Sequence, residues 1–289
     1  MEDIQGIDTR EFTIGDPDEK DRVIRGRVHL PEGTEDTGAE LPYVLILHGF
    51  KGFMDWGFFP ELARRLVMRG IGAVPFNFSG SGIGEDPMEI TEDEAFSKNT
   101  PSRAVEDVAR VRALIDSGAV AGINPPRCGI MGHSFGGGVA YLHAAKRHDY
   151  QAIVTWAPVG EFERRIEDVE LWRKQGYIEI PNGRTGQKHR LGLGWLDDVV
   201  NNKAAVDVVA ACARLSSPTL ICHGTKDRAV PLDEAEKLRD AYEKKYCRFL
   251  CLEGAGHTFG GAHPLTQIDP DLETVLRETV EMFATHLLQ

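Results

Sequence analysis

The sequence has no long apolar run and no excess of basic residues. Its apolar stretches fall well short of the roughly 20 residues that a membrane-spanning helix needs. With 33 Lys and Arg against 45 Asp and Glu among its 289 residues, the chain carries a formal net charge of −12. Nucleic acids and anionic membrane surfaces both bind proteins through basic faces. We therefore expect neither a nucleic-acid partner nor a membrane partner.

The chain also lacks cysteines at the spacing of a redox or zinc motif. Its 5 cysteines are an odd number, and none forms a C-x-x-C pair. Cys128, Cys222, Cys247 and Cys251 lie in or beside apolar runs, which predicts buried thiols in a reducing compartment. Residues 1–4 are acidic and lack the basic-then-apolar pattern of a signal peptide. Together these absences predict a cytoplasmic protein.

Short apolar runs alternate with amphipathic stretches along most of the chain. An N-terminal pair of strands is expected at residues 10–15 and 22–30. Later apolar runs predict buried strands at residues 43–47, 71–78, 128–131, 152–156, 219–222 and 248–252. Apolar residues at helical spacing predict helices at residues 57–69, 102–116, 205–214, 232–244 and 271–287. This alternation predicts an α/β fold with a mostly parallel central sheet and helices on both faces.

The alternation breaks between residue 157 and about residue 203. This segment has mixed charge, several glycines and four aromatic residues, Phe162, Trp172, Tyr177 and Trp195. We interpret it as a cap insertion after the sixth strand of a single domain that covers residues 1–289. The four aromatic residues form either a lid over a site or the small core of the insertion.

The most informative motif is Gly132-His133-Ser134-Phe135-Gly136. An apolar strand precedes it and a helical stretch follows it, so the serine lies at the apex of a sharp turn and takes a strained backbone conformation. Glycines two positions before and after the serine allow the strand and the helix to approach closely. The next backbone N–H lies at a helix N-terminus, which favours a developing anion. This motif alone arises by chance, so the neighbouring strand ends decide its meaning.

Reactive side chains follow other predicted strands. His48-Gly49-Phe50, Asp227 and His257 all stand just beyond an apolar run. In parallel sheets, functional groups gather at the carboxyl ends of the strands. A serine hydroxyl needs a base to remove its proton, and an imidazole base needs an acceptor on its other nitrogen. Ser134, Asp227 and His257 supply these groups in the chain order Ser, Asp, His.

On these motifs, residues 40–289 resemble a serine esterase of the α/β-hydrolase superfamily. The chain is most similar to feruloyl/cinnamoyl-type esterases and to dienelactone-hydrolase-like bacterial proteins, although dienelactone hydrolases carry cysteine where Ser134 stands. The resemblance implies an α/β-hydrolase fold in which Ser134 is the nucleophile, His257 the base and Asp227 its orienting partner. It also implies an oxyanion hole formed by the backbone N–H groups of Phe50 and Phe135, and no cofactor.

Several other residues are weaker candidates. His48 and His133 flank the predicted site, and we interpret both as hydrogen-bonded packing residues rather than reactants. His263 lacks the Gly-x-Gly sequence that precedes His257, and Asp233 lies inside a predicted helix, so neither replaces a triad member. The other histidines considered are expected at the surface: His143, His148, His189 and His286. Because the sequence has no H-x-x-x-H motif and no cysteine cluster, we expect no metal site.

The sequence favours hydrolysis of a small-molecule carboxylic ester through an acyl-enzyme intermediate. An aminopeptidase-like or acyl-thioesterase-like hydrolase of the same fold is the alternative. A charged substrate terminus would then bind acidic residues of the insertion, such as Glu161, Glu163, Glu167 or Glu170. A third hypothesis is a binding protein that has lost turnover. The sequence leaves the natural substrate and the oligomeric state open, a homodimer included.

Overall fold

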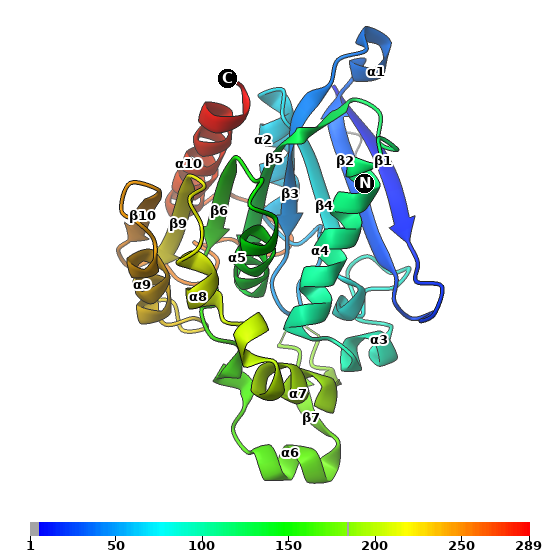
Figure 1. The fold of residues 1–289 in the computed structure, drawn as a ribbon, viewed down its shortest axis with the longest axis vertical. Helices are drawn as coiled ribbons and strands as arrows, with labels where there is room; N and C mark the ends of the chain where they lie inside the picture. Colours follow the sequence, from blue (N-terminus) through cyan, green and yellow to red (C-terminus); the bar gives the residue numbers. More distant parts are fainter. Residues whose placement is uncertain (1–5, 184) are drawn as a thin grey trace.

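An eight-stranded sheet forms the centre of the molecule (Figure 1). The structure, a computed structural model, describes residues 6–183 and 185–289. The strands of this sheet are β1 (Ile7–Ile14), β2 (Ile24–Pro31), β3 (Leu41–Leu47), β4 (Gly72–Asn77), β5 (Ile123–His133), β6 (Ala152–Trp156), β9 (Thr219–Gly224) and β10 (Cys247–Leu252). Their order is β1-β2-β4-β3-β5-β6-β9-β10, with β2 antiparallel to both its neighbours and every other pair parallel. The predicted mostly parallel sheet is confirmed.

Helices cover both faces of the sheet (Figure 1). One face packs against α2 (Phe59–Met68) and α10 (Pro270–Leu287). The other packs against α4 (Pro101–Asp116), α5 (Phe135–Arg147), α8 (Val208–Cys212) and α9 (Leu232–Ala241). The helix expected at 205–214 is shorter than predicted, because the 3-10 turn η3 (Lys203–Ala205) precedes it and Asp207 caps α8 by accepting from the N–H of Ala210.

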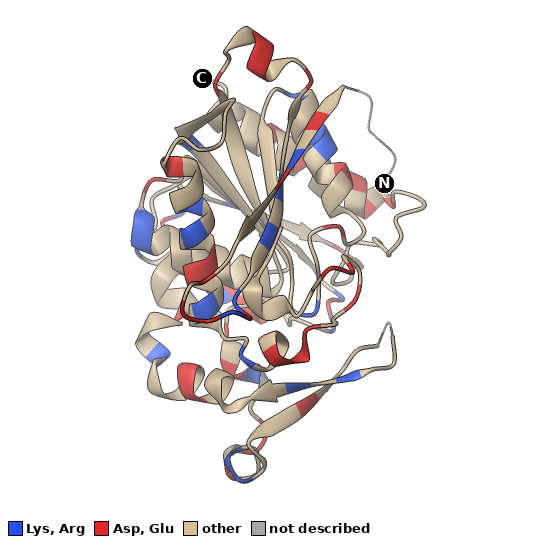
Figure 2. Cartoon of the chain, turned by 90° about the vertical axis from the view of Figure 1, so that its right-hand side faces the viewer, with Lys and Arg blue, Asp and Glu red and all other residues tan. Residues whose placement is uncertain are grey.

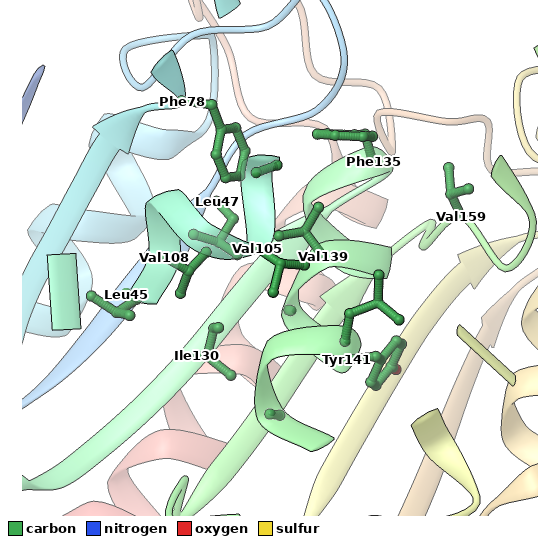
Figure 3. Packing of buried hydrophobic residues seen from close by; sticks show 14 of the residues in the cluster. Leu45, Leu47, Phe78, Val105, Val108, Ile130, Phe135, Val139, Tyr141 and Val159 are labelled. Atoms are coloured by element: carbon green, nitrogen blue, oxygen red, sulfur yellow. The ribbon is translucent and has the colours of Figure 1, made fainter. Parts of the chain in front are cut away.

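Alternate residues of the central strands are divided between the two cores. Leu45 and Leu47 pack with the α4 and α5 side, whereas Val44 and Ile46 pack with α2 and α10. Figure 3 shows Leu45, Leu47 and Ile130 among the buried side chains of the first core. Successive strand residues point to opposite faces, so two covered faces require continuous apolar strands. Accordingly β3, β4, β6 and β9 contain no charged residue, and in Figure 2 charges of both signs spread over the helices, loops and edge strands.

The structure adds two short helices in segments for which the sequence analysis predicts neither a helix nor a strand. These are α1 (Thr34–Thr37) and α3 (Asp93–Ser97). In α3, Ala95 and Phe96 are buried while the acidic first turn is exposed, so this short helix packs on the core through an apolar pair. The 3-10 turn η1 (Ser79–Ser81) follows β4 directly.

The segment of residues 157–203, which we call the cap, follows β6 and contains its own small elements. These are η2 (Phe162–Arg165), α6 (Val169–Gln175), the antiparallel hairpin of β7 (Tyr177–Pro181) and β8 (Lys188–Gly192), and α7 (Leu193–Asn201). The Asp198 carboxylate of α7 accepts hydrogen bonds from the backbone N–H and the hydroxyl of Ser102, at 2.8 and 2.6 Å. His189 of β8 bonds to Asp93 of α3 at 2.8 Å. The cap is therefore fastened to α3 and to the start of α4.

The cysteines differ in exposure, which corrects part of the sequence interpretation. Cys128 and Cys222 are buried as predicted, but Cys247 is half-buried and Cys251 is exposed. Both of the latter lie on β10, which is an edge strand of the sheet and so has a strand neighbour on one side only.

Two histidines that were expected at the surface are buried. His143 bonds through Nδ1 to the Tyr150 hydroxyl at 2.8 Å, and His189 bonds to Asp93. Burial, together with the nearby charges of Arg112 and Arg147, lowers the pKa of His143 to about 3. The prediction was wrong because sequence alone does not reveal the hydrogen-bond partner that allows a polar side chain to be buried.

Gly136 lies so close to the end of β3 that a larger residue cannot replace it without strain. A Cβ atom on this residue would lie 2.5 Å from the Leu47 carbonyl oxygen and 2.6 Å from the His48 carbonyl oxygen. Because both atoms belong to the backbone, we expect Gly136→Ala to lower the free energy of unfolding by about 3 kcal/mol or more. Gly15→Ala, where a Cβ meets nothing within 4 Å, is the control. Urea unfolding curves check this, and equal midpoints for Gly136→Ala and wild type would contradict it.

His143 makes the stability depend on pH. The unfolded chain binds a proton at this histidine below about pH 6.5, whereas the folded chain does so only near pH 3, so acidification favours unfolding. His143→Asn can keep the bond to Tyr150 through an amide placed where Nδ1 stands. Between pH 7 and pH 5 we expect wild type to lose roughly 1–2 kcal/mol more than this variant in urea unfolding. His148→Asn, at an exposed position, should lose as much as wild type; equal losses in all three proteins would refute the account.

Candidate active site

The site lies where the strand order of the sheet reverses. After β3 the chain forms β4 on one side of β3 and then β5 on the other. Ligands of open α/β sheets bind beyond the carboxyl ends of strands at such a reversal. Here it brings Gly49, which follows β3, next to Ser134, which follows β5: a Cβ on Gly49 would lie 3.2 Å from the Ser134 Cβ.

Ser134 has the strained backbone that the sequence predicted. It joins β5 to α5 with φ 55° and ψ −119°, in a region that residues other than glycine seldom adopt. Its N–H donates to the Trp156 carbonyl at 2.9 Å, and its own carbonyl accepts from the N–H of Val159 at 3.0 Å and of Gly137 at 2.9 Å. The end of β6 and the first turn of α5 therefore hold the serine at the apex.

Asp227 and His257 are in direct contact. Asp227 follows β9, His257 follows β10, and His257 Nδ1 lies 2.7 Å from Asp227 Oδ2. The other carboxylate oxygen, Oδ1, accepts from the N–H groups of Ala229 and Val230 at 2.8 and 2.9 Å. Burial alone would raise the pKa of the Asp227 carboxyl, but the hydrogen bond and charge of His257 and the two N–H donors outweigh it and lower this pKa. Asp227 is thus held as a carboxylate facing His257.

His257 also lies beside the serine turn. Its ring centroid is 4.7 Å from that of His133, the residue before Ser134. Within residues 6–183 and 185–289, the Ser134 side chain is buried and its hydroxyl makes no hydrogen bond to another residue. The structure therefore gathers the three predicted residues from the ends of β5, β9 and β10.

The two weaker candidates are engaged elsewhere. His263 accepts a hydrogen bond from the N–H of Gly57 at 3.0 Å and stacks on Trp56. Asp233 pairs with Lys237 on the outer side of α9.

Phe50 and Phe135 stand on either side of the serine turn. Phe135 is the first residue of α5, where backbone N–H groups have no partner within the helix and the helix dipole favours negative charge. The Gly49 carbonyl, in the same peptide unit as the Phe50 N–H, accepts from His48 Nδ1 at 2.8 Å and from the N–H of Gly52 at 2.9 Å. The His48 side chain is buried and hydrogen-bonded, as the sequence interpretation held, and it fixes the orientation of that peptide.

Aromatic residues of the cap pack against these two phenylalanines. The Trp195 ring lies 5.4 Å from that of Phe50 and 5.7 Å from that of Phe135, and the Phe162 ring lies 5.6 Å from that of Phe135. Tyr177 instead stacks under Arg190, 4.3 Å from its guanidinium carbon. Phe162 and Trp195 thus form an apolar wall next to the serine turn.

Glu234 was not among the residues predicted from sequence, where no motif marks it. This residue of α9 is buried, and its carboxylate accepts hydrogen bonds from the N–H of Gly160, the N–H of Glu161 and the guanidinium of Arg164 at 2.9, 3.2 and 2.6 Å. Burial raises the pKa of the Glu234 carboxyl, although these three donors oppose that rise. Glu234 fastens the start of the cap to α9, which follows the Asp227 loop.

The structure also bears on metal-ligand groups and on membrane-spanning helices. Within the described residues, no three His, Cys, Asp or Glu side chains are grouped as metal ligands. In the same part of the chain, no helix is both long enough and apolar enough to cross a bilayer.

Several solved structures share this fold. A putative hydrolase from Agrobacterium vitis S4 is 21% identical, with a TM-score of 0.72 over 96% of this chain and 99% of that chain. Est1E from Butyrivibrio proteoclasticus is 18% identical, with a TM-score of 0.68 over 96% and 99%. A dienelactone hydrolase from Anabaena variabilis is 16% identical, with a TM-score of 0.60 over 98% and 100%. The predicted α/β-hydrolase fold is confirmed.

Comparison with curated proteins found no match. The model of the prolyl oligopeptidase family matches residues 65–277, a span that runs from α2 into α10 and includes Ser134, Asp227 and His257. Because this match covers well over half of the chain, the protein belongs to the prolyl oligopeptidase family and is a hydrolase of the α/β-hydrolase fold.

Proposed function

We propose that the protein is a serine hydrolase that cleaves carboxylic esters of small molecules through an acyl-enzyme intermediate. The observation that carries this proposal is the 2.7 Å contact between His257 Nδ1 and Asp227 Oδ2 beside the strained turn of Ser134. A carboxylate on Nδ1 leaves Nε2 as the basic nitrogen of the imidazole, which is the requirement for activating a serine hydroxyl.

In the proposed reaction, Ser134 Oγ attacks the acyl carbonyl while His257 Nε2 takes the hydroxyl proton. The N–H groups of Phe50 and Phe135 stabilise the tetrahedral oxyanion, and one such donor is typically worth about 2.7–4 kcal/mol in the transition state. Asp227 orients the ring and stabilises the imidazolium that forms. His257 then protonates the leaving alcohol, and water cleaves the acyl-enzyme by the same steps in reverse.

Two features support an ester with an apolar acyl group. The rings of Phe50, Phe135, Phe162 and Trp195 pack together next to the serine turn, so the surroundings of Ser134 on this side are apolar, as sites for apolar groups are. One structure with the same fold is described as Est1E with ferulic acid bound, at 18% identity and a TM-score of 0.62. That ligand is an aromatic carboxylic acid.

Amide hydrolysis is the second candidate, because the chain belongs to the prolyl oligopeptidase family. A peptide substrate with a free amino terminus would need a negatively charged group of the protein to bind that ammonium. Two of the acidic cap residues already form ion pairs, Glu161 with Lys237 at 2.9 Å and Glu163 with Lys203 at 3.4 Å. The exposed Glu167 and Glu170 are then the remaining candidates for binding a substrate ammonium.

Rates on the ester, thioester and aminoacyl-amide forms of one acyl group distinguish these functions. We expect the ester to have the highest kcat/KM, and Ser134→Ala to lower it by at least about 10³-fold, because the alanine has no nucleophile. The highest kcat/KM on the amide would replace the ester proposal with the peptidase. Full activity of Ser134→Ala on all three substrates would contradict both.

A further inference from the structure

His133 connects the serine turn to the loop of His257. Its Nε2 lies 3.1 Å from the main-chain carbonyl oxygen of His257, and the two imidazole rings are 4.7 Å apart. The His133 side chain is only 6% exposed although it has two polar atoms. Since β5 ends at His133, this hydrogen bond joins the centre of the sheet to a surface loop.

The surroundings of His133 determine which nitrogen carries the proton. A carbonyl oxygen can only accept, so Nε2 must be the donor. On the opposite side, the backbone of Gly49 closes in on Nδ1: a Cβ atom on Gly49 would lie 3.2 Å from it. The rings of Phe58 and Phe59 meet the imidazole edge to face at 5.3 and 6.3 Å. The ring is therefore a neutral imidazole with its hydrogen on Nε2.

The charges around His133 agree with this assignment. Burial, followed by the neighbouring His257 and by His223, lowers the pKa of His133 to about 3, against the opposing effects of Asp227 and of the hydrogen bond to the His257 carbonyl. The ring therefore stays uncharged at neutral pH. An uncharged neighbour does not oppose the positive charge that His257 acquires when it takes a proton.

The loop that carries His257 is anchored by the buried Ala255 and Phe259, whereas the glycines before His257 add no side-chain contacts. Gly254 has φ 80°, and a Cβ atom on either Gly254 or Gly256 would meet nothing within 4 Å. The bond to Asp227 holds the imidazole of His257 but does not act on the main-chain carbonyl of this residue. A second hydrogen bond to the His257 carbonyl restrains that backbone.

We propose that His133 is a positioning residue that holds the general base against the nucleophile, by donating Nε2–H to the main-chain carbonyl of His257. This inference rests on the proposed function, since it assumes that His257 is the base for Ser134. A displacement of about 1 Å can cost on the order of 100-fold in rate. The effect of losing His133 should therefore appear in kcat and not in KM.

Two substitutions separate the hydrogen bond from the packing. In His133→Gln the side-chain amide can stand where Nε2 stands, because both nitrogens are three bonds from Cβ. In His133→Asn the amide reaches only the position of Nδ1. We expect kcat for the ester to fall about 10–100-fold in His133→Asn with KM within about 2-fold, and His133→Gln to recover most of it. His143→Asn, at a buried histidine of α5 away from the site, is the matched control and should keep kcat.

Equal kcat values for His133→Gln and His133→Asn would overturn the proposal. It would also be overturned if, among these two variants and His143→Asn, the loss of kcat simply increased with the loss of melting temperature. Nitrogen-15 chemical shifts of the wild-type imidazoles test it without any substitution: His133 should carry its proton on Nε2 between about pH 6 and pH 8, and a proton on Nδ1 would overturn it. Ser134→Ala measured in parallel separates the two claims. If that variant stays active, the proposed function fails; if it is inactive and His133→Asn has wild-type kcat, only this inference fails.

Discussion

The strained backbone of Ser134 is the constraint on which the rest of the site depends. A residue held in a sparsely populated region costs of order 1–3 kcal/mol, so the surroundings must determine it fully. Here the Trp156 carbonyl, at the end of β6, accepts from the Ser134 N–H. The N–H of Val159, at the start of the cap, donates to the Ser134 carbonyl. Gly132 is equally constrained, since a Cβ on it would collide with the Gly136 carbonyl.

Charge in the site is controlled by burial and by directed N–H groups. Asp227 keeps its negative charge because two backbone N–H groups and His257 face its oxygens. The nearby His48 and His133 are kept neutral, since burial lowers their pKa values to about 4 and about 3. As a result, the charged group bonded to His257 is the Asp227 carboxylate, which stabilises the imidazolium when it forms. The N-terminus of α5 supplies the complementary positive potential where Ser134 stands.

The parts of the structure that depend on local sequence could be predicted, and the parts that depend on distant partners could not. The turn at Ser134 and the buried run of β3 follow from residues next to each other, so motif and periodicity were sufficient. The burial of His143 depends on Tyr150, and the role of Glu234 depends on backbone groups of the cap that lie about 70 residues away in the chain. A surface acid and a buried one look alike in sequence until such partners are known.

The most direct test of the account is covalent labelling of the folded wild-type protein with an alkyl fluorophosphonate, followed by intact-mass measurement and peptide mapping. A fluorophosphonate reacts much faster with a serine that a neighbouring base activates than with an ordinary hydroxyl. The account predicts a single adduct, located on Ser134, that forms more slowly in Asp227→Asn because His257 loses its orienting carboxylate. An adduct on another residue, or an unchanged labelling rate in Asp227→Asn, would contradict the proposed triad.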